Sequence, residues 1–246
     1  MRPLQTDLSI FEKFKFERPP VGVRYLPTKP EGIERIGEKL NICQMLPEAH
    51  KGEPFYAQKE DITCVGSLYL GMRDLPAFES GRVGPKLGIY KDRRANEKIY
   101  RLIARLPKGS IKYVAFAPLD KLSFDPDVLI LTGNVEQAEI LLRATTYRLG
   151  GVFCGRTSNG VGCNWVFVYP YISGEVNFTV TGLGFGLGLP NGLIIVSIPY
   201  NLLPETIANL REMEWRAPQN VMSADELKKR TDEIHEEILA EIGEKL

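Results

Sequence analysis

The sequence predicts an α/β or α+β fold, a single domain with a mixed sheet flanked by helices. Short apolar runs of strand character alternate along the chain with longer segments of helical periodicity. The run at 128–132, followed directly by a helical segment, is the most βα-like unit. The 246 residues, 43% of them hydrophobic, are enough to bury a sizeable core without disulfides.

The elements expected in the first half begin with a short amphipathic helix over 8–17, which Pro19 and Pro20 end. The next elements are a strand over 21–26, a helix over 40–49, an extended segment over 55–63, a short helix from Cys64 to Gly71, a glycine-rich loop over 81–88 and a helix over 91–106. In that last helix the apolar residues recur at helical spacing and predict its buried face: Ala95, Ile99, Leu102, Ile103 and Leu106.

The second half predicts more strands and ends in helices. The expected elements are strands over 111–118 and 128–132, a helix over 135–149 that Gly150 and Gly151 end, strands over 169–171, 177–181 and 193–198, and helices over 204–213 and 223–246. Ser223 and Glu226 form a capping box at the start of the last helix. We therefore expect one domain over 1–222 and a separate amphipathic helix over 223–246.

Two segments, 19–75 and 126–200, indicate a weak internal duplication. In each, a glycine precedes a phenylalanine by three residues and a cysteine by twelve or thirteen. The two sets are Gly52, Phe55 and Cys64, and Gly150, Phe153 and Cys163. A true duplication would let Cys64 and Cys163 approach each other near a pseudo-twofold axis, whereas chance similarity would carry no such consequence.

Charge and hydropathy exclude several classes of function. The 31 basic and 31 acidic residues cancel, which argues against a nucleic-acid binder driven by overall charge. No stretch reaches the ~18 consecutive apolar residues of a membrane span, and the N-terminal residues lack the apolar core of a signal peptide. We expect a cytoplasmic protein without a membrane partner.

The four cysteines, Cys43, Cys64, Cys154 and Cys163, are the first candidate site. A reducing cytosol disfavours structural disulfides and leaves buried small residues, metal ligands or redox-active thiols. Four thiolates are the usual ligands of a [4Fe–4S] cluster, and three suffice when one iron stays open. Zinc is less favoured because the chain holds only two histidines. Buried thiols without chemistry remain the plain alternative.

A glycine- and hydroxyl-rich loop over 155–162 is the second candidate site. Its first five residues would cradle an anionic ligand with backbone N–H groups and a guanidinium: Gly155, Arg156, Thr157, Ser158 and Asn159. No Gly-Lys-Ser/Thr follows, so the loop is not a Walker A motif, and a flexible turn is the alternative. The glycine-rich stretch over 181–192 likewise fails the GxGxxG pattern of a Rossmann site.

Two charged helices indicate partners. Residues 82–121 hold eleven basic and three acidic residues, and four bases share one face of the 91–106 helix: Arg94, Lys98, Arg101 and Arg105. Such a face would steer an acidic redox protein or an anionic ligand, or would simply be solvated. The apolar seam of the 223–246 helix would dock on the body of the protein or pair two copies in a homodimer.

Several blocks of the sequence resemble a known family: FERPPVGVRYL, CQMLPEAHKGEPFYAQKEDITC, PDVLILTGN and CNWVFVYPYISGEVNFTVTG. Their order is similar to that of the uncharacterised ArCR family of archaea and anaerobic bacteria, from about Phe11 to Leu210. The resemblance implies one family-wide domain without an established activity. It places Cys43, Cys64 and Cys163 in recurrent cysteine blocks and makes Cys154 a local addition. An anaerobic setting favours an oxygen-sensitive cluster.

These observations together predict a redox or cofactor-binding protein that carries a cysteine-ligated iron–sulfur cluster. The alternatives are a module that binds a small anionic metabolite without catalysis and an accessory subunit that docks a partner protein. Whether the chain is an enzyme stays open.

Overall fold

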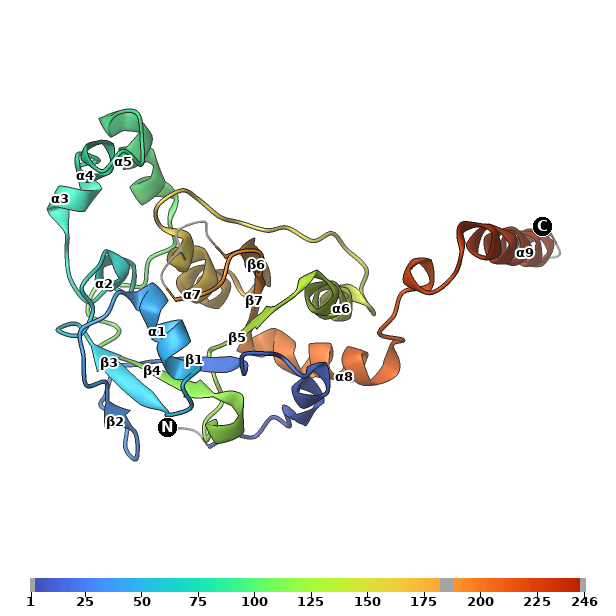
Figure 1. The fold of residues 1–246 in the computed structure, drawn as a ribbon, viewed down its shortest axis with the longest axis horizontal. Helices are drawn as coiled ribbons and strands as arrows, with labels where there is room; N and C mark the ends of the chain where they lie inside the picture. Colours follow the sequence, from blue (N-terminus) through green and yellow to red (C-terminus); the bar gives the residue numbers. More distant parts are fainter. Residues whose placement is uncertain (1–2, 182–187, 244–246) are drawn as a thin grey trace. The chain divides into compact units, whose positions relative to one another are not determined.

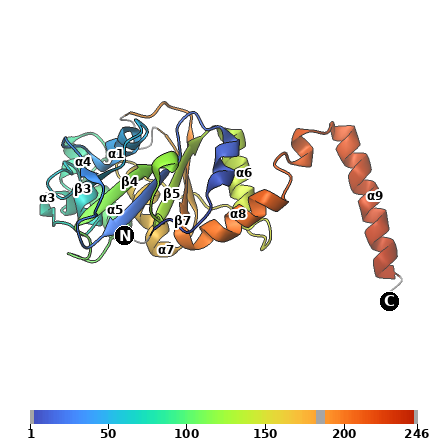
Figure 2. The ribbon, with the colours of Figure 1, turned by 90° about the horizontal axis from the view of Figure 1, so that it is seen from below.

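The computed structural model describes residues 3–181 and 188–243 (Figures 1 and 2). Half of the glycine-rich stretch over 181–192, residues 182–187, therefore lies outside the described residues. The chain divides into two compact units, Met1–Arg211 and Glu212–Leu246. The second unit contains the helix α9, Ala224–Gly243, in which none of the described residues is buried. The candidate sites all belong to the first unit.

Within the described residues, seven strands form one sheet in the order β2-β3-β4-β1-β5-β7-β6. The strands are β1 (Val21–Leu26), β2 (Glu34–Arg35), β3 (Phe55–Gln58), β4 (Tyr113–Pro118), β5 (Val128–Gly133), β6 (Asn177–Val180) and β7 (Ile194–Pro199). Only β2 and β3 pair in parallel, and the other neighbours are antiparallel. The predicted mixed sheet flanked by helices is confirmed.

Helices cover both faces of this sheet. The longer ones are α1 (Ile42–Ala49), α5 (Arg93–Leu102), α6 (Val135–Thr146), α7 (Gly162–Ser173) and α8 (Leu203–Glu212), and the short ones are α2 (Gly66–Tyr69), α3 (Pro76–Glu79) and α4 (Val83–Lys86). Short 3₁₀ helices occur at η1 (Ser9–Phe14), η2 (Leu119–Lys121), η3 (Tyr200–Leu202) and η4 (Pro218–Asn220). In the described ranges no helix combines the length and the apolar character that crossing a bilayer requires.

The main apolar core lies on the face of the sheet that α1, α2 and α7 cover (Figure 1). In β5, Val128 and Ile130 belong to this core, whereas Leu129 and Leu131 are buried toward the opposite face. The opposite face carries α6 and α8, which Asn209 links by donating from Nδ2 to the Ala144 carbonyl at 2.8 Å. Cys43 and Cys163 lie in the main core, and Cys64 packs against it.

Three sequence-based expectations need correction. The segment 169–171, expected as a strand, lies inside the helix α7. The helix expected over 91–106 ends at Leu102, because Ile103 has an extended backbone, and it buries Asn96 and Tyr100 while Ala95 and Leu102 are exposed. The 81–88 loop contains the short helix α4.

The two halves of the sheet repeat one arrangement. The antiparallel strands β1 and β5 lie at the centre of the arrangement. Outward from this pair, β1 is followed by β4 and then β3, and β5 is followed by β7 and then β6. The first residue of β1 pairs with Pro118 at the end of β4, and the first residue of β5 pairs with Pro199 at the end of β7. Each proline is followed by a 3₁₀ turn, η2 or η3.

The two cysteines compared in the sequence hold different places in this arrangement. Cys64 follows β3, whereas Cys163 precedes β6. Phe55 lies in β3, but Phe153 lies in an exposed segment between α6 and α7. The similarity of the halves therefore resides in the strands and their register, and the two thiols meet for a different reason, namely that α2 and α7 pack together.

Candidate functional site

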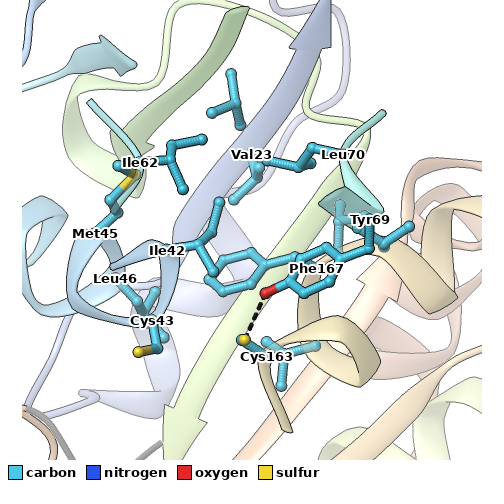
Figure 3. Packing of buried hydrophobic residues seen from close by; sticks show 14 of the residues in the cluster. Val23, Ile42, Cys43, Met45, Leu46, Ile62, Tyr69, Leu70, Cys163 and Phe167 are labelled. Carbon is cyan, nitrogen blue, oxygen red and sulfur yellow. Dashed lines mark hydrogen bonds between the residues drawn. The ribbon is translucent and has the colours of Figure 1, made fainter. Parts of the chain in front are cut away.

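Three of the four cysteines come together beside the sheet. Cys43 lies in the first turn of α1, Cys64 stands two residues before α2, and Cys163 is the second residue of α7. The hydroxyl of Tyr69 and the sulfur of Cys163 form a hydrogen bond of 2.5 Å. Figure 3 shows this bond and places Cys43 in the same apolar cluster. Residues from three distant parts of the chain thus bring their thiols to one region.

The sulfur of Cys64 accepts two backbone hydrogen bonds. The amides of Ile42 and Gly66, the first residues of α1 and α2, donate to Sγ at 3.4 and 3.3 Å. Amide donors directed at a sulfur favour negative charge on it. Gly66 permits this geometry, since a Cβ there would lie 2.7 Å from Ile42 and 3.2 Å from the Cys64 sulfur. The sulfur of this half-buried residue is therefore held between two backbone amides.

The other two thiols are buried and protonated when no ligand is bound. Burial, followed by the Cys64 charge, raises the pKa of Cys43 to about 11. Burial also raises the pKa of Cys163 well above its usual value, and the charges of Cys64 and Cys43 act in the same direction. Burial and the charge on Cys163 likewise raise the pKa of Tyr69. A bound metal would reverse this state, because a coordinating thiol is deprotonated.

Cys154 lies elsewhere. It is exposed and lines a cavity of about 350 Å³ between α6, β6 and the segment after α6, together with Phe153, Arg156 and Glu175. Cys64 lines a different cavity, of about 300 Å³. The structure thus brings together Cys43, Cys64 and Cys163 and leaves Cys154 apart from them.

As they stand, the described residues contain no three His, Cys, Asp or Glu side chains arranged to hold a single metal ion. A cluster distributes its thiolate ligands over several irons, so its cysteines stand further apart than the ligands of one ion. The hydrogen bonds to Cys64 and Cys163 are of the kind that stabilise cluster sulfurs.

The loop candidate is held by side chains from three directions. The Arg156 amide donates to Asn177 Oδ1 at 2.7 Å, Ser158 Oγ accepts from Trp165 Nε1 at 2.7 Å, and Asn159 Nδ2 donates to the Ile89 carbonyl at 2.8 Å. Gly155 lies against β6, and Thr157 is exposed. The Arg156 amide is thus already bonded within the protein, and the Arg156 guanidinium, 5.1 Å from the Tyr169 ring, is the positive charge of these five residues.

The basic face of α5 is partly neutralised. Arg101 pairs with Glu97 at 2.5 Å, and Arg105, which lies past the end of α5, pairs with Glu79 at 2.5 Å. Arg94 and Lys98 are exposed on the same helix. The positive charge available to an acidic partner is therefore smaller than the sequence count indicates.

Two residues of the site escaped the sequence reasoning. Tyr69 lies in the short helix expected from Cys64 to Gly71, and neither it nor Asn96 was among the candidate site residues. The signal for Tyr69 was its spacing, since it follows Cys64 by five residues across the small residues Gly66 and Ser67. Asn96 and Tyr100 lie four residues apart, which places both on one helix face, but nothing in the sequence says that this face is buried.

The chain is an α/β protein with a mixed seven-stranded sheet and a group of thiols beside it. The family model described as "Uncharacterised ArCR" matches residues 9–209, and the chain belongs to this family, as the sequence blocks predicted. An uncharacterised protein of Methanocaldococcus jannaschii is 30% identical over 151 residues, which are 58% of this chain and 64% of that protein. The match thus spans less than two thirds of this curated relative's length. No solved structure matches the chain.

Proposed function

We propose that this chain is a cytoplasmic redox or cofactor-binding protein that holds an iron–sulfur cluster on Cys43, Cys64 and Cys163. The observation that carries the proposal is the meeting of these three thiols, from positions far apart in the sequence, in one apolar region. Burial in such a region excludes water and oxygen from a cluster, and three ligands leave one iron open. Cys154 serves as a fourth ligand only if its segment moves.

The cluster would supply one-electron transfer or an open iron for a substrate, and the chain would supply its setting. The amides of Ile42 and Gly66 would compensate charge on the Cys64 thiolate. The Tyr69 hydroxyl would donate to the Cys163 thiolate. Hydrogen bonds to the sulfurs raise the reduction potential of a cluster, so these donors set its working range.

Iron and acid-labile sulfide, measured on the full chain purified and reconstituted without oxygen, test this proposal. We expect about four irons per chain with broad visible absorbance. Cys64→Ser and Cys163→Ser should lose most of the iron, and Cys154→Ser is the matched control that should retain it. A colourless protein without iron, or equal loss in all three variants, would refute a three-cysteine site.

Arg156 supports a second candidate, the binding of a small anionic metabolite. Its side chain lines the 350 Å³ cavity next to Cys154, and Thr145 and Thr146 supply hydroxyls there. Glu175 lines the same cavity, so an anion would have to bind on the arginine side. Titration with inorganic phosphate, followed by NMR of the wild-type chain and of Arg156→Gln, tests this candidate. Saturable shifts that the variant loses would support it, and identical behaviour of the two proteins would contradict it.

A further inference from the structure

A second cavity reaches Cys64 from the side of α4 and α5. Its volume is about 300 Å³, and it is lined by segments around residues 41, 64, 84, 90 and 160. Most of its wall is apolar: Val65, Phe78, Val83, Leu87, Ile89 and Val161. None of the described residues that line it carries a charge; the polar ones are amides, hydroxyls and the Cys64 thiol. A wall of this kind accepts an uncharged ligand and rejects an ion, which would lose its hydration without gaining a partner.

Asn96 gives this cavity a specific polar group. Its side chain is only 2% exposed, and its Nδ2 atom has no hydrogen-bond partner in the described residues. A buried donor without a partner is destabilising unless something else satisfies it. Gly84 lies directly against this amide, because a Cβ at position 84 would be 2.7 Å from Asn96 Cγ and 2.8 Å from Nδ2. Asn96 is among the residues that line the cavity, and a ligand oxygen that reached its Nδ2 would satisfy this donor.

The thiol of Cys64 is the reactive group at the same cavity. Its sulfur accepts the two amide hydrogen bonds already described and is among the groups that line the cavity. Cys43 and Cys163 are buried behind it in the core and do not line the cavity. Among the cysteines of the group, Cys64 is therefore the one that a molecule entering from solvent meets.

We propose that this cavity binds an uncharged small molecule with an apolar body and a carbonyl-type acceptor, which takes a hydrogen bond from Asn96 Nδ2 and lies against the Cys64 sulfur. The assignment does not depend on the cluster. With a cluster bound, the ligand would lie beside Cys64 on the solvent side, and without one it would contact the thiol itself.

The test measures how fast N-ethylmaleimide modifies Cys64 in the full, metal-free chain, with peptide mass spectrometry reading each cysteine separately. Three probes of similar size are compared: acetophenone, which has an acceptor, ethylbenzene, which lacks one, and benzoate, which is charged. We expect acetophenone to slow modification of Cys64 about two- to tenfold more than ethylbenzene, the effect of one net hydrogen bond. Benzoate should give no protection. The exposed Cys154, in its separate cavity, is the internal control and should react at the same rate throughout.

Asn96→Ala should abolish the difference between acetophenone and ethylbenzene while Cys64 stays reactive. Leu87→Trp, at an exposed position of the cavity wall, is the second variant and should slow modification of Cys64 without any probe. The proposal is overturned if acetophenone gives no protection, if benzoate protects equally, or if Asn96→Ala keeps the preference for acetophenone. A Cys64 that resists N-ethylmaleimide altogether would also overturn it. Iron content is a separate readout, so a failure here is distinguishable from a failure of the cluster proposal.

Discussion

His50 is a half-buried histidine whose two ring nitrogens are buried, and folding keeps it neutral. Both ring nitrogens lack a hydrogen-bond partner in the described residues. Burial, with the nearby Arg18 charge acting in the same direction, lowers the pKa of His50 to about 4. An unfolded chain would bind a proton at His50 near pH ~6.5. Between these values the unfolded state holds more protons than the folded state, so acid favours unfolding.

We therefore expect the free energy of unfolding to hold its full value above pH ~6.5. It should fall as the pH drops toward about 4. The expected loss from His50 is on the order of 1–3 kcal/mol. Urea unfolding of the wild type and of His50→Leu across this range measures it, and the variant should show a flatter pH profile. His235→Gln, on the exposed helix α9, is the control that should follow the wild type. Parallel profiles for His50→Leu and the wild type would contradict the assignment.

At this scale the sequence predicted which residue types carry chemistry but not which of them meet. The four cysteines were identifiable as a group, yet their spacing could not separate Cys154 from the other three. That separation depends on α7 packing against α2, a contact between segments almost a hundred residues apart. The sequence did not predict the burial of Asn96 for the same reason, since this burial depends on α4 and on the cavity wall rather than on its own helix.

The helix α7 shows how packing overrides local preference. Its run of aromatic and β-branched residues, with Pro170 near its end, is typical of a strand and led to the strand expected over 169–171. In the fold, seven consecutive residues of this helix, 162–168, are buried, so it has no polar face to produce an amphipathic pattern. Helix periodicity detects elements with one buried face, and α7 escapes it because it is enclosed. The elements with one buried face, such as α6 and α8, were predicted close to their true bounds.

Asn164 fixes α7 against the segment that follows α5. Its Nδ2 donates to the Ala104 carbonyl at 2.7 Å, and its Oδ1 accepts from the Ala104 amide at 3.2 Å. The side chain is fully buried, and it bonds both backbone polar groups of Ala104, as a neighbouring strand would. Replacing it with alanine leaves the half-buried amide and carbonyl of Ala104 unpaired, so Asn164→Ala should lower the free energy of unfolding by about 1–3 kcal/mol.

Chemical denaturation of Asn164→Ala measures this loss. The matched control is Asn159→Ala, which removes one hydrogen bond to the Ile89 carbonyl at an exposed position and should cost about 1 kcal/mol or less. If the two variants lose the same stability, the link between α7 and the end of α5 is not a structural anchor.

At the scale of the whole molecule, we expect the first unit to determine stability and α9 to determine association. None of the described residues of α9 is buried, and its apolar seam is exposed: Ile234 at 38%, Ile238 at 47%, Leu239 at 55% and Ile242 at 51%. Removing residues 223–246 should therefore leave the thermal unfolding of the first unit within about 2 °C of the full chain. The homodimer predicted from this seam is tested by the same deletion.

Light scattering of the full chain and of the deletion measures the mass directly. A dimeric full chain and a monomeric deletion would assign association to α9. The variant Ile234→Ser/Ile238→Ser keeps the length and should act like the deletion. A deletion that unfolds well below the full chain would show instead that α9 stabilises the first unit.

The ribosome releases β1 well before its central partner β5, so these two strands pair late in synthesis. β5 begins about 100 residues after β1 ends, an interval of roughly 5–20 s at ~5–20 residues per second. During this time β3 and β4 complete the first half of the sheet, while the edge of β1 that β5 will occupy stays open. An open edge accepts any strand of suitable register, and a neighbouring nascent chain offers the same one. Domain swapping is therefore a hazard of synthesis for this protein, and it grows with the crowding of ribosomes on the message.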